Sequence, residues 1–261
     1  MPDAGAAAGP GGALDRLPGF RRRFLVTPAA GRVTAAVEDD YHCMAVTLHH
    51  ADGAVTRVEP VMDRAPWTTC PGAPDMLRAT FAGVPLAEVA TRGEKQANCT
   101  HLYDLALLAA AHADGQAAVR YDILVSDPIE GSVDAEIRRD GQPVHHIRHR
   151  DDIVMAPVEI AGTSLFKLRG WIESLTGEER EAARLLQWGT ILAHGRAIPI
   201  ERQSDASRMP ANCYTFQPGR KEQARRVGRV VDFSAGCEAP LGRFDGEAFL
   251  DPDGSGRSTS A

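Results

Sequence analysis

The chain has 261 residues, of which 43% are hydrophobic and 25% are charged, and its formal net charge is −6. This composition is typical of a globular protein and excludes wholesale disorder and collagen-like repetition. The acidic balance argues against nucleic acid as a partner, because neutralising phosphates requires a basic surface. No stretch approaches 18 apolar residues, and the first residues lack the pattern of a secretory signal. We therefore expect a cytoplasmic protein with no membrane partner.

A disordered lead-in (1–18), rich in Ala, Gly and Pro, is expected before a first α+β unit at 19–115. Alternation of apolar and polar residues predicts its strands, and apolar residues at helical spacing predict its longest helix. Its predicted strands are Arg21–Thr27, Arg32–Asp39, Met44–His49 and Ala54–Pro60, and its predicted helices are Pro74–Phe81, Pro85–Thr91 and Thr100–Ala113.

A second α+β unit is expected at 116–196, because the first plan recurs about 100 residues later. Leu25–Gly31 has a counterpart in Leu124–Gly131. The strands predicted after it are Ser132–Arg138, Val144–Arg150 and Ile153–Ile160, and the predicted helices are Leu165–Leu175 and Glu178–His194. We interpret the fold as α+β, a tandem duplication of an antiparallel hairpin sheet followed by helices. The alternative is two unrelated stretches of strands and helices.

Residues 197–240 fit neither unit and are expected to form an arm that wraps over both halves. The arm contains a basic stretch, Arg220–Arg229, whose alternative interpretations are a solvated helix face and a functional surface. Residues 241–261 are expected to be a disordered tail.

Five cysteines, which are odd in number and include no CxxC pair, indicate free thiols. They are Cys43, Cys70, Cys99, Cys213 and Cys237. Asn98 is a good N-cap, which would place Cys99 in the first turn of a helix with His101 two residues later. The helix dipole would then lower the pKa of Cys99 below about 8.5. The alternative is that Cys99 packs under the hairpins while His101 caps the helix.

Cys70 lies in a loop before a helix, after the same hairpin that precedes Cys99, so we expect the two thiols to lie near each other. The segments Pro66-Trp67-Thr68-Thr69-Cys70 and Asn98-Cys99-Thr100-His101-Leu102 resemble an uncharacterised bacterial domain family with the pattern Pro-(Tyr/Trp)-x-x-Cys and Cys-Thr-His-Leu. This resemblance implies no activity.

The order of hairpin, loop cysteine and cysteine-led helix more distantly resembles the NifU/IscU-type iron–sulfur scaffold and the SufE-type sulfur acceptor. This resemblance implies NifU/SufE-like units and a cluster or persulfide role for Cys70 and Cys99. Where that scaffold has its first cysteine, this chain has Asp40-Tyr41-His42-Cys43, with Cys43 one residue late.

No GxGxxG, GxxxxGK[ST], GxSxG or HExxH motif is present, which disfavours nucleotide cofactors, serine esterase chemistry and a zincin site. By elimination, the sequence predicts a cofactor-independent lyase, isomerase or hydrolase in a cleft between the two units. Its substrate is expected to be a small organic molecule, with aromatic molecules among the candidates. The predicted site residues are Tyr41, His42, Cys70, Cys99, His101 and Tyr103 for catalysis and Trp67 for substrate binding.

The alternative function is an iron–sulfur or sulfur-handling scaffold in which Cys70 and Cys99, with a distant histidine, hold a cluster, zinc or a persulfide. An interaction module with no site of its own is a third hypothesis. Besides the substrate, a second copy of the chain is left open as a partner.

Overall fold

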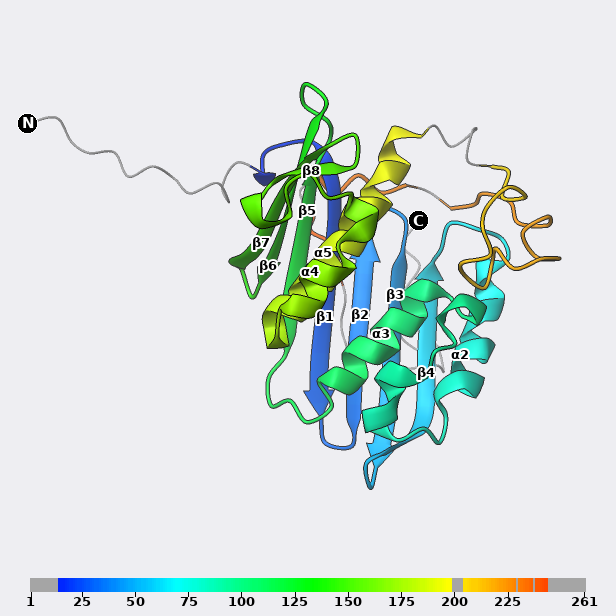
Figure 1. Cartoon of the computed structure of the whole chain (residues 1–261). Helices are drawn as coiled ribbons and strands as arrows, with labels where there is room; N and C mark the ends of the chain where they lie inside the picture. The colour runs from blue at the N-terminus through cyan, green and yellow to red at the C-terminus, as the bar shows by residue number, and fades with distance from the viewer. Residues whose placement is uncertain (1–13, 199–203, 229, 237, 244–261) are drawn as a thin grey trace, which may run out of the picture.

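A single antiparallel sheet of eight strands organises the computed structural model, which describes residues 14–198, 204–228, 230–236 and 238–243 (Figure 1). The strand order is β4-β3-β2-β1-β5-β6-β7-β8. The strands are β1 (Gly19–Ala29), β2 (Arg32–Asp39), β3 (Cys43–Ala51), β4 (Ala54–Arg64), β5 (Val119–Ser126), β6 (Ser132–Arg139), β7 (Gln142–Arg150) and β8 (Ile153–Ala156).

The helices cover one face of this sheet, with α3 over β2 and β3 and α5 over β5 and β6 (Figure 1). The helices are α2 (Ala73–Phe81), α3 (Thr100–Ala111), α4 (Arg169–Ser174) and α5 (Gly177–Ala193). Short 3₁₀ turns are η1 (Cys70–Gly72), η2 (Leu86–Thr91), η3 (Lys95–Ala97), η4 (Val158–Ile160), η5 (Leu165–Lys167) and η6 (His194–Ala197).

The main core lies between the sheet and these helices. Alternate strand residues such as Phe24, Leu48 and Ile137 point into it, as the period of two along a strand requires. Leu102 and Leu186 meet them from α3 and α5. A smaller apolar cluster on the opposite face of the sheet is closed by Leu241.

The two predicted units share one continuous sheet, because β1 pairs with β5 across the middle of the molecule. Each half is a four-stranded meander followed by helices, and the strand order runs outward from this central pair in both directions. The structure is thus a mixed α+β fold, and its halves are joined edge to edge rather than standing apart.

Several predicted element boundaries are corrected. β8 ends at Ala156, short of the predicted Ile160, because Pro157 has no amide hydrogen for the strand ladder. The helix predicted at 85–91 is a 3₁₀ segment. The predicted helix 165–175 divides into η5 and α4.

Parts of the predicted disordered ends are packed. Leu14 is buried, and the Asp15 carboxylate pairs with Arg138. At the other end, the Leu241 amide donates to the Glu38 carboxylate at 2.6 Å. The expectations for 1–13 and 244–261 lie outside the described residues.

The predicted arm, of which the structure describes residues 197–198, 204–228, 230–236 and 238–240, contacts widely separated elements. The Tyr214 amide donates to the Asn98 carbonyl at 2.8 Å, and the Val231 amide donates to the Asp40 carbonyl at 2.9 Å. Ser234 Oγ accepts from the Gly19 amide at 3.0 Å. The arm therefore contacts the backbone beside Cys99, in the turn between β2 and β3, and at the start of β1.

Gly19 provides a test of the central pair. A Cβ at this position would lie 2.0 Å from the Val125 carbonyl oxygen of β5. We expect Gly19→Ala to lower the free energy of unfolding by at least about 2 kcal/mol, because backbone must move to relieve the overlap. Urea denaturation measures this value. The matched control is Gly170→Ala in α4, where an added Cβ has nothing within 4 Å and should stabilise by about 0.5–1 kcal/mol. Equal effects of the two substitutions would contradict the predicted close approach.

Candidate functional site

A cavity of about 480 Å³ lies where the two halves meet. It is bounded by the start of β1, the turn between β2 and β3, the end of β5, the C-terminal end of α5 with η6, and the arm. Its apolar wall includes Phe20, Val125, Val133, Ala193, Ile198 and Val230. Its charged and phenolic residues are Tyr41, Asp127, Arg196, Arg226 and Asp232. A largely apolar wall with a few polar groups is typical of a small-molecule site.

The tight turn between β2 and β3 places Tyr41 in this wall. The Asp39 carboxylate accepts the backbone N–H groups of Tyr41 and His42, each at 2.8 Å, and closes the turn. The Tyr41 ring stacks on Phe20 with a centroid distance of 6.1 Å. Its hydroxyl is buried and has no hydrogen-bond partner among the described residues. Tyr41 therefore lines the wall with a hydroxyl that is unpaired and closed off from solvent, so a ligand reaches it only when neighbouring groups shift.

Burial and the neighbouring Asp40 carboxylate raise the pKa of Tyr41 above its usual value. The hydroxyl therefore stays protonated at any pH near neutrality. A protonated phenol can donate a hydrogen bond to a carbonyl or an oxyanion, but it cannot serve as a base.

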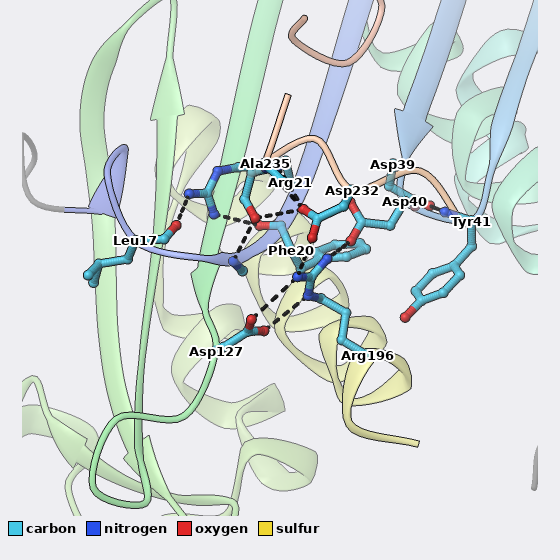
Figure 2. Close-up of polar contacts among 12 residues, drawn as sticks. Leu17, Phe20, Arg21, Asp39, Asp40, Tyr41, Asp127, Arg196, Asp232 and Ala235 are labelled. Carbon is cyan, nitrogen blue, oxygen red and sulfur yellow. Dashed lines mark hydrogen bonds and ion pairs between the residues drawn. The ribbon is translucent and has the colours of Figure 1, made fainter. Parts of the chain in front are cut away.

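Arg196 joins three parts of the chain at the edge of the cavity (Figure 2). Its guanidinium pairs with Asp40 from the β2–β3 turn, with Asp127 after β5 at 3.0 Å, and with Asp232 of the arm at 3.1 Å. Although burial opposes the change, the hydrogen bonds that Arg196 donates to these carboxylates raise its pKa. One cation thus ties both halves and the arm together.

Asp40 is the least satisfied of these carboxylates. Its side chain is completely buried, and its Oδ1 has no partner among the described residues. Burial, only partly offset by Arg196, raises the pKa of Asp40 to about 7. Asp40 therefore changes charge near neutrality, although it lies behind the cavity wall rather than in it.

This raised pKa predicts a pH dependence of stability. Between pH of about 4 and about 7 the folded protein binds a proton at Asp40 that the unfolded chain has released, so the free energy of unfolding falls as the pH rises through this window. We expect Asp40→Asn to make this pH-dependent decrease in the free energy of unfolding smaller by on the order of 2–4 kcal/mol. Urea denaturation of the variant and the wild type across the window measures the difference.

Asp127→Asn is the matched control, because Asp127 pairs with the same guanidinium but is 43% exposed. If both substitutions change the pH dependence equally, burial of Asp40 is not its cause.

His42 and His101, both predicted catalytic residues, stack on each other with ring centroids 3.9 Å apart. His42 Nδ1 lies 2.9 Å from Asp39 Oδ1, and Arg22 pairs with the same carboxylate. Although burial opposes it, His42 and Arg22 hold the pKa of Asp39 well below its usual range. Burial and then the nearby His42 lower the pKa of His101, so its ring is neutral at pH 7. The two rings form a polar cluster outside the cavity wall.

Three thiols gather between α3 and the arm. Cys70 Sγ lies 3.2 Å from Thr215 Oγ1. Burial first, and then nearby Cys70 and Cys213, raise the pKa of Cys99 to about 12. Burial also raises the pKa of Cys70 and of Cys213. These cysteines therefore resemble packed thiols rather than activated ones.

The prediction of a lowered pKa for Cys99 is wrong. Cys99 is itself the N-cap of α3, not a first-turn residue, and it is only 8% exposed. The Asn98 side chain does not cap the helix, because its amide donates to Thr80 Oγ1 at 2.9 Å and to the Glu94 carbonyl at 3.1 Å. The free-energy cost of desolvating a buried thiolate is larger than the stabilisation that a helix dipole provides.

Alkylation rates follow from this correction. At pH 7.5 we expect iodoacetamide to label Cys213 before Cys43, Cys70 or Cys99, because Cys213 is the only half-exposed thiol of these four. Burial likewise raises the pKa of Cys43 to about 12, so Cys43 and Cys99 should label comparably slowly. Mass spectrometry of each cysteine peptide over time measures the order. Fast labelling of Cys99 would restore the activated-thiol hypothesis. Cys237 lies outside the described residues.

The remaining predicted site residues lie away from the cavity wall. Tyr103 packs on Phe81, with ring centroids 5.0 Å apart. Trp67 and Cys70 pack in a small cluster under the arm with Ala206 and Ala224. Of the seven predicted site residues, Tyr41 alone lines the cavity that the described residues form.

Sequence reasoning missed the charged residues of the wall. Asp127, Arg196 and Asp232 are far apart in the chain and carry no motif. Arg226 lies in the basic stretch that the sequence did single out, but nothing in that stretch distinguishes it from its neighbours.

Comparison with known proteins adds no assignment: the chain matches neither a protein-family model nor a curated protein sequence. Within the described part of the chain, no group of three or more His, Cys, Asp or Glu side chains is arranged to hold a metal ion. In the same residues, no helix combines the length and the apolar character that crossing a membrane requires.

Proposed function

We propose that the protein is a cofactor-independent enzyme, of the lyase class, that acts on a small organic molecule in the cavity between its two halves. The observation that carries this proposal is the Tyr41 hydroxyl, which is buried beside a largely apolar cavity without a hydrogen-bond partner among the described residues. An unpaired buried hydroxyl destabilises the folded protein, and a ligand that accepts its hydrogen bond removes that cost.

The chemistry assigned to Tyr41 is stabilisation of negative charge. A phenol that stays protonated can donate to the oxygen of a substrate carbonyl, and the hydrogen bond strengthens as that oxygen becomes anionic. Asp40 adjoins Tyr41 in the chain and changes charge near pH 7. Asp40 is therefore a positioning residue, since its charge acts on Tyr41 and Arg196 from behind the wall.

The cavity's aromatic wall residues, Phe20 and Tyr41, favour a substrate with an aromatic or other flat apolar body. We also propose a role in the breakdown of aromatic compounds, and a cytoplasmic location remains a prediction from the sequence. We also propose that the two halves arose by tandem duplication of a NifU/SufE-like unit. Their matching order of strands and helices supports the duplication.

A second candidate function is sulfur handling, which the gathering of Cys70, Cys99 and Cys213 favours. The described residues contain no group of three or more side chains arranged to hold a metal ion. A bound cluster or zinc ion would therefore require additional ligands or a different arrangement of these residues. Metal analysis and the visible spectrum of the protein purified without oxygen distinguish the two functions. Stoichiometric iron or zinc that is lost in Cys70→Ser and Cys99→Ser would favour sulfur or cluster chemistry.

Tyr41→Phe tests whether the buried Tyr41 hydroxyl lacks a partner, and it does so without a known substrate. We expect this substitution to leave the free energy of unfolding unchanged or to raise it by up to about 1 kcal/mol, because it removes an unpaired buried hydroxyl. It should also weaken ligands that carry a carbonyl or carboxylate by about tenfold, as measured by ligand-observed NMR with a panel of small organic molecules.

The matched control is Tyr121→Phe. The Tyr121 hydroxyl donates to Glu181 at 2.6 Å, so its loss should destabilise the protein by about 1–3 kcal/mol. If Tyr41→Phe destabilises the protein as much as Tyr121→Phe, the Tyr41 hydroxyl already has a partner and the proposal loses its basis.

A further inference from the structure

Arg226 brings a cation from the arm into the cavity wall. Its guanidinium carbon lies 5.2 Å from the centroid of the Tyr41 ring and 5.6 Å from that of the Trp67 ring. Backbone hydrogen bonds on either side fix this part of the arm: Thr68 N–H donates to the Arg225 carbonyl, and Val227 N–H donates to the Pro66 carbonyl, each at 3.0 Å. The backbone at Arg226 is therefore held in place before any ligand binds.

No carboxylate pairs with Arg226 among the described residues, although its side chain is half-buried. Arg196, in the same wall, has three carboxylates. Burial lowers the pKa of Arg226, which is the expected direction for a cation that lacks a counter-ion. Two aromatic rings compensate only part of the lost hydration. The planar fork of N–H donors matches a carboxylate, which would supply the missing charge.

We propose that Arg226 is the anchor for the carboxylate of a small monoanionic ligand whose apolar body fills the cavity. This proposal rests on the proposed function, and it names the chemical class of the substrate. The planar fork of Arg226 donates two N–H groups to one carboxylate, which leaves the single O–H of Tyr41 for the substrate carbonyl. The arm is thus part of the binding site.

The charges around Arg226 favour a single negative charge on the ligand. Asp127 and Asp232 also line the cavity. Although burial opposes it, hydrogen bonds from Ser234 and Arg196 lower the pKa of Asp232 to about 2, so it is ionised at neutral pH. Arg196 already pairs with three carboxylates, so its positive charge is not available to a ligand. A dicarboxylate or a phosphate dianion would place its second charge against these aspartates. The site therefore selects monocarboxylates over dianions.

Fluorine NMR titrations test the proposal, with 4-fluorobenzoate as the anionic probe and 4-fluorobenzamide as its neutral isostere. We expect the wild type to bind the benzoate at least tenfold more tightly than the benzamide, and to bind 4-fluorophthalate at least fivefold more weakly than the benzoate. Arg226→Gln should reduce benzoate affinity at least tenfold and change benzamide affinity less than twofold. Arg226→Lys keeps the charge but not the planar fork, so its benzoate affinity should lie between those of the wild type and Arg226→Gln. It also provides the test if Arg226→Gln does not fold.

Arg225→Gln is the matched control, because Arg225 is exposed and, within the described part of the chain, its guanidinium donates to the Glu222 and Ala224 carbonyls alone. It should bind both probes as the wild type does. If Arg226→Gln keeps benzoate affinity, or loses both probes equally, Arg226 is not a carboxylate anchor. If the wild type binds both probes equally and Tyr41→Phe weakens the binding of both, the cavity is a ligand site as proposed and only the assignment of Arg226 as the anchor is wrong. If neither probe binds the wild type, the proposed function and the anchor both fail.

Discussion

The ion-pair junction at Arg196 is the interaction on which the cavity depends. Asp40, Asp127 and Asp232 come from three separate stretches of chain, and a single guanidinium holds them within hydrogen-bonding distance of one point (Figure 2). Backbone bonds at Gly19 and Asp40 join the arm to the same region. The cavity is therefore defined by long-range contacts, and it forms only when both halves and the arm are in place.

Sharing one cation among three carboxylates has an electrostatic consequence. Asp39 and Asp40 are adjacent and both completely buried, yet their pKa values move in opposite directions. Asp39 has Arg22, His42 and two backbone N–H groups. Asp40 has a fraction of Arg196 and one unpartnered oxygen, so desolvation prevails. One buried carboxylate thus serves as a fixed structural charge, while its neighbour can change charge near neutrality.

The sequence predicts much of the fold because local patterns specify the local elements. Asp52 and Gly53 adopt positive φ in the turn that an Asp-Gly pair predicts, and the alternating residues from Met44 to Leu48 form the strand β3. The continuity of the sheet through β1 and β5 was beyond such patterns, since pairing of distant strands leaves no local signature. The N-cap prediction failed for a related reason: a tertiary partner, Thr80, engages the Asn98 side chain.

The candidate site was less predictable than the fold, because its charged groups acquire their role from burial. A sequence shows that Arg226 is one of several arginines in a basic stretch. It does not show that Arg226 faces two aromatic rings with no carboxylate partner among the described residues, whereas Arg220 lies over Tyr214 and donates to its carbonyl. A surface arginine loses little by lacking a partner, because water solvates it. A half-buried arginine in a cavity wall loses that water, so the absence of a partner becomes a constraint on what the cavity holds. The same reasoning makes the unpaired Tyr41 hydroxyl informative, and the two groups together define the polar end of an otherwise apolar site.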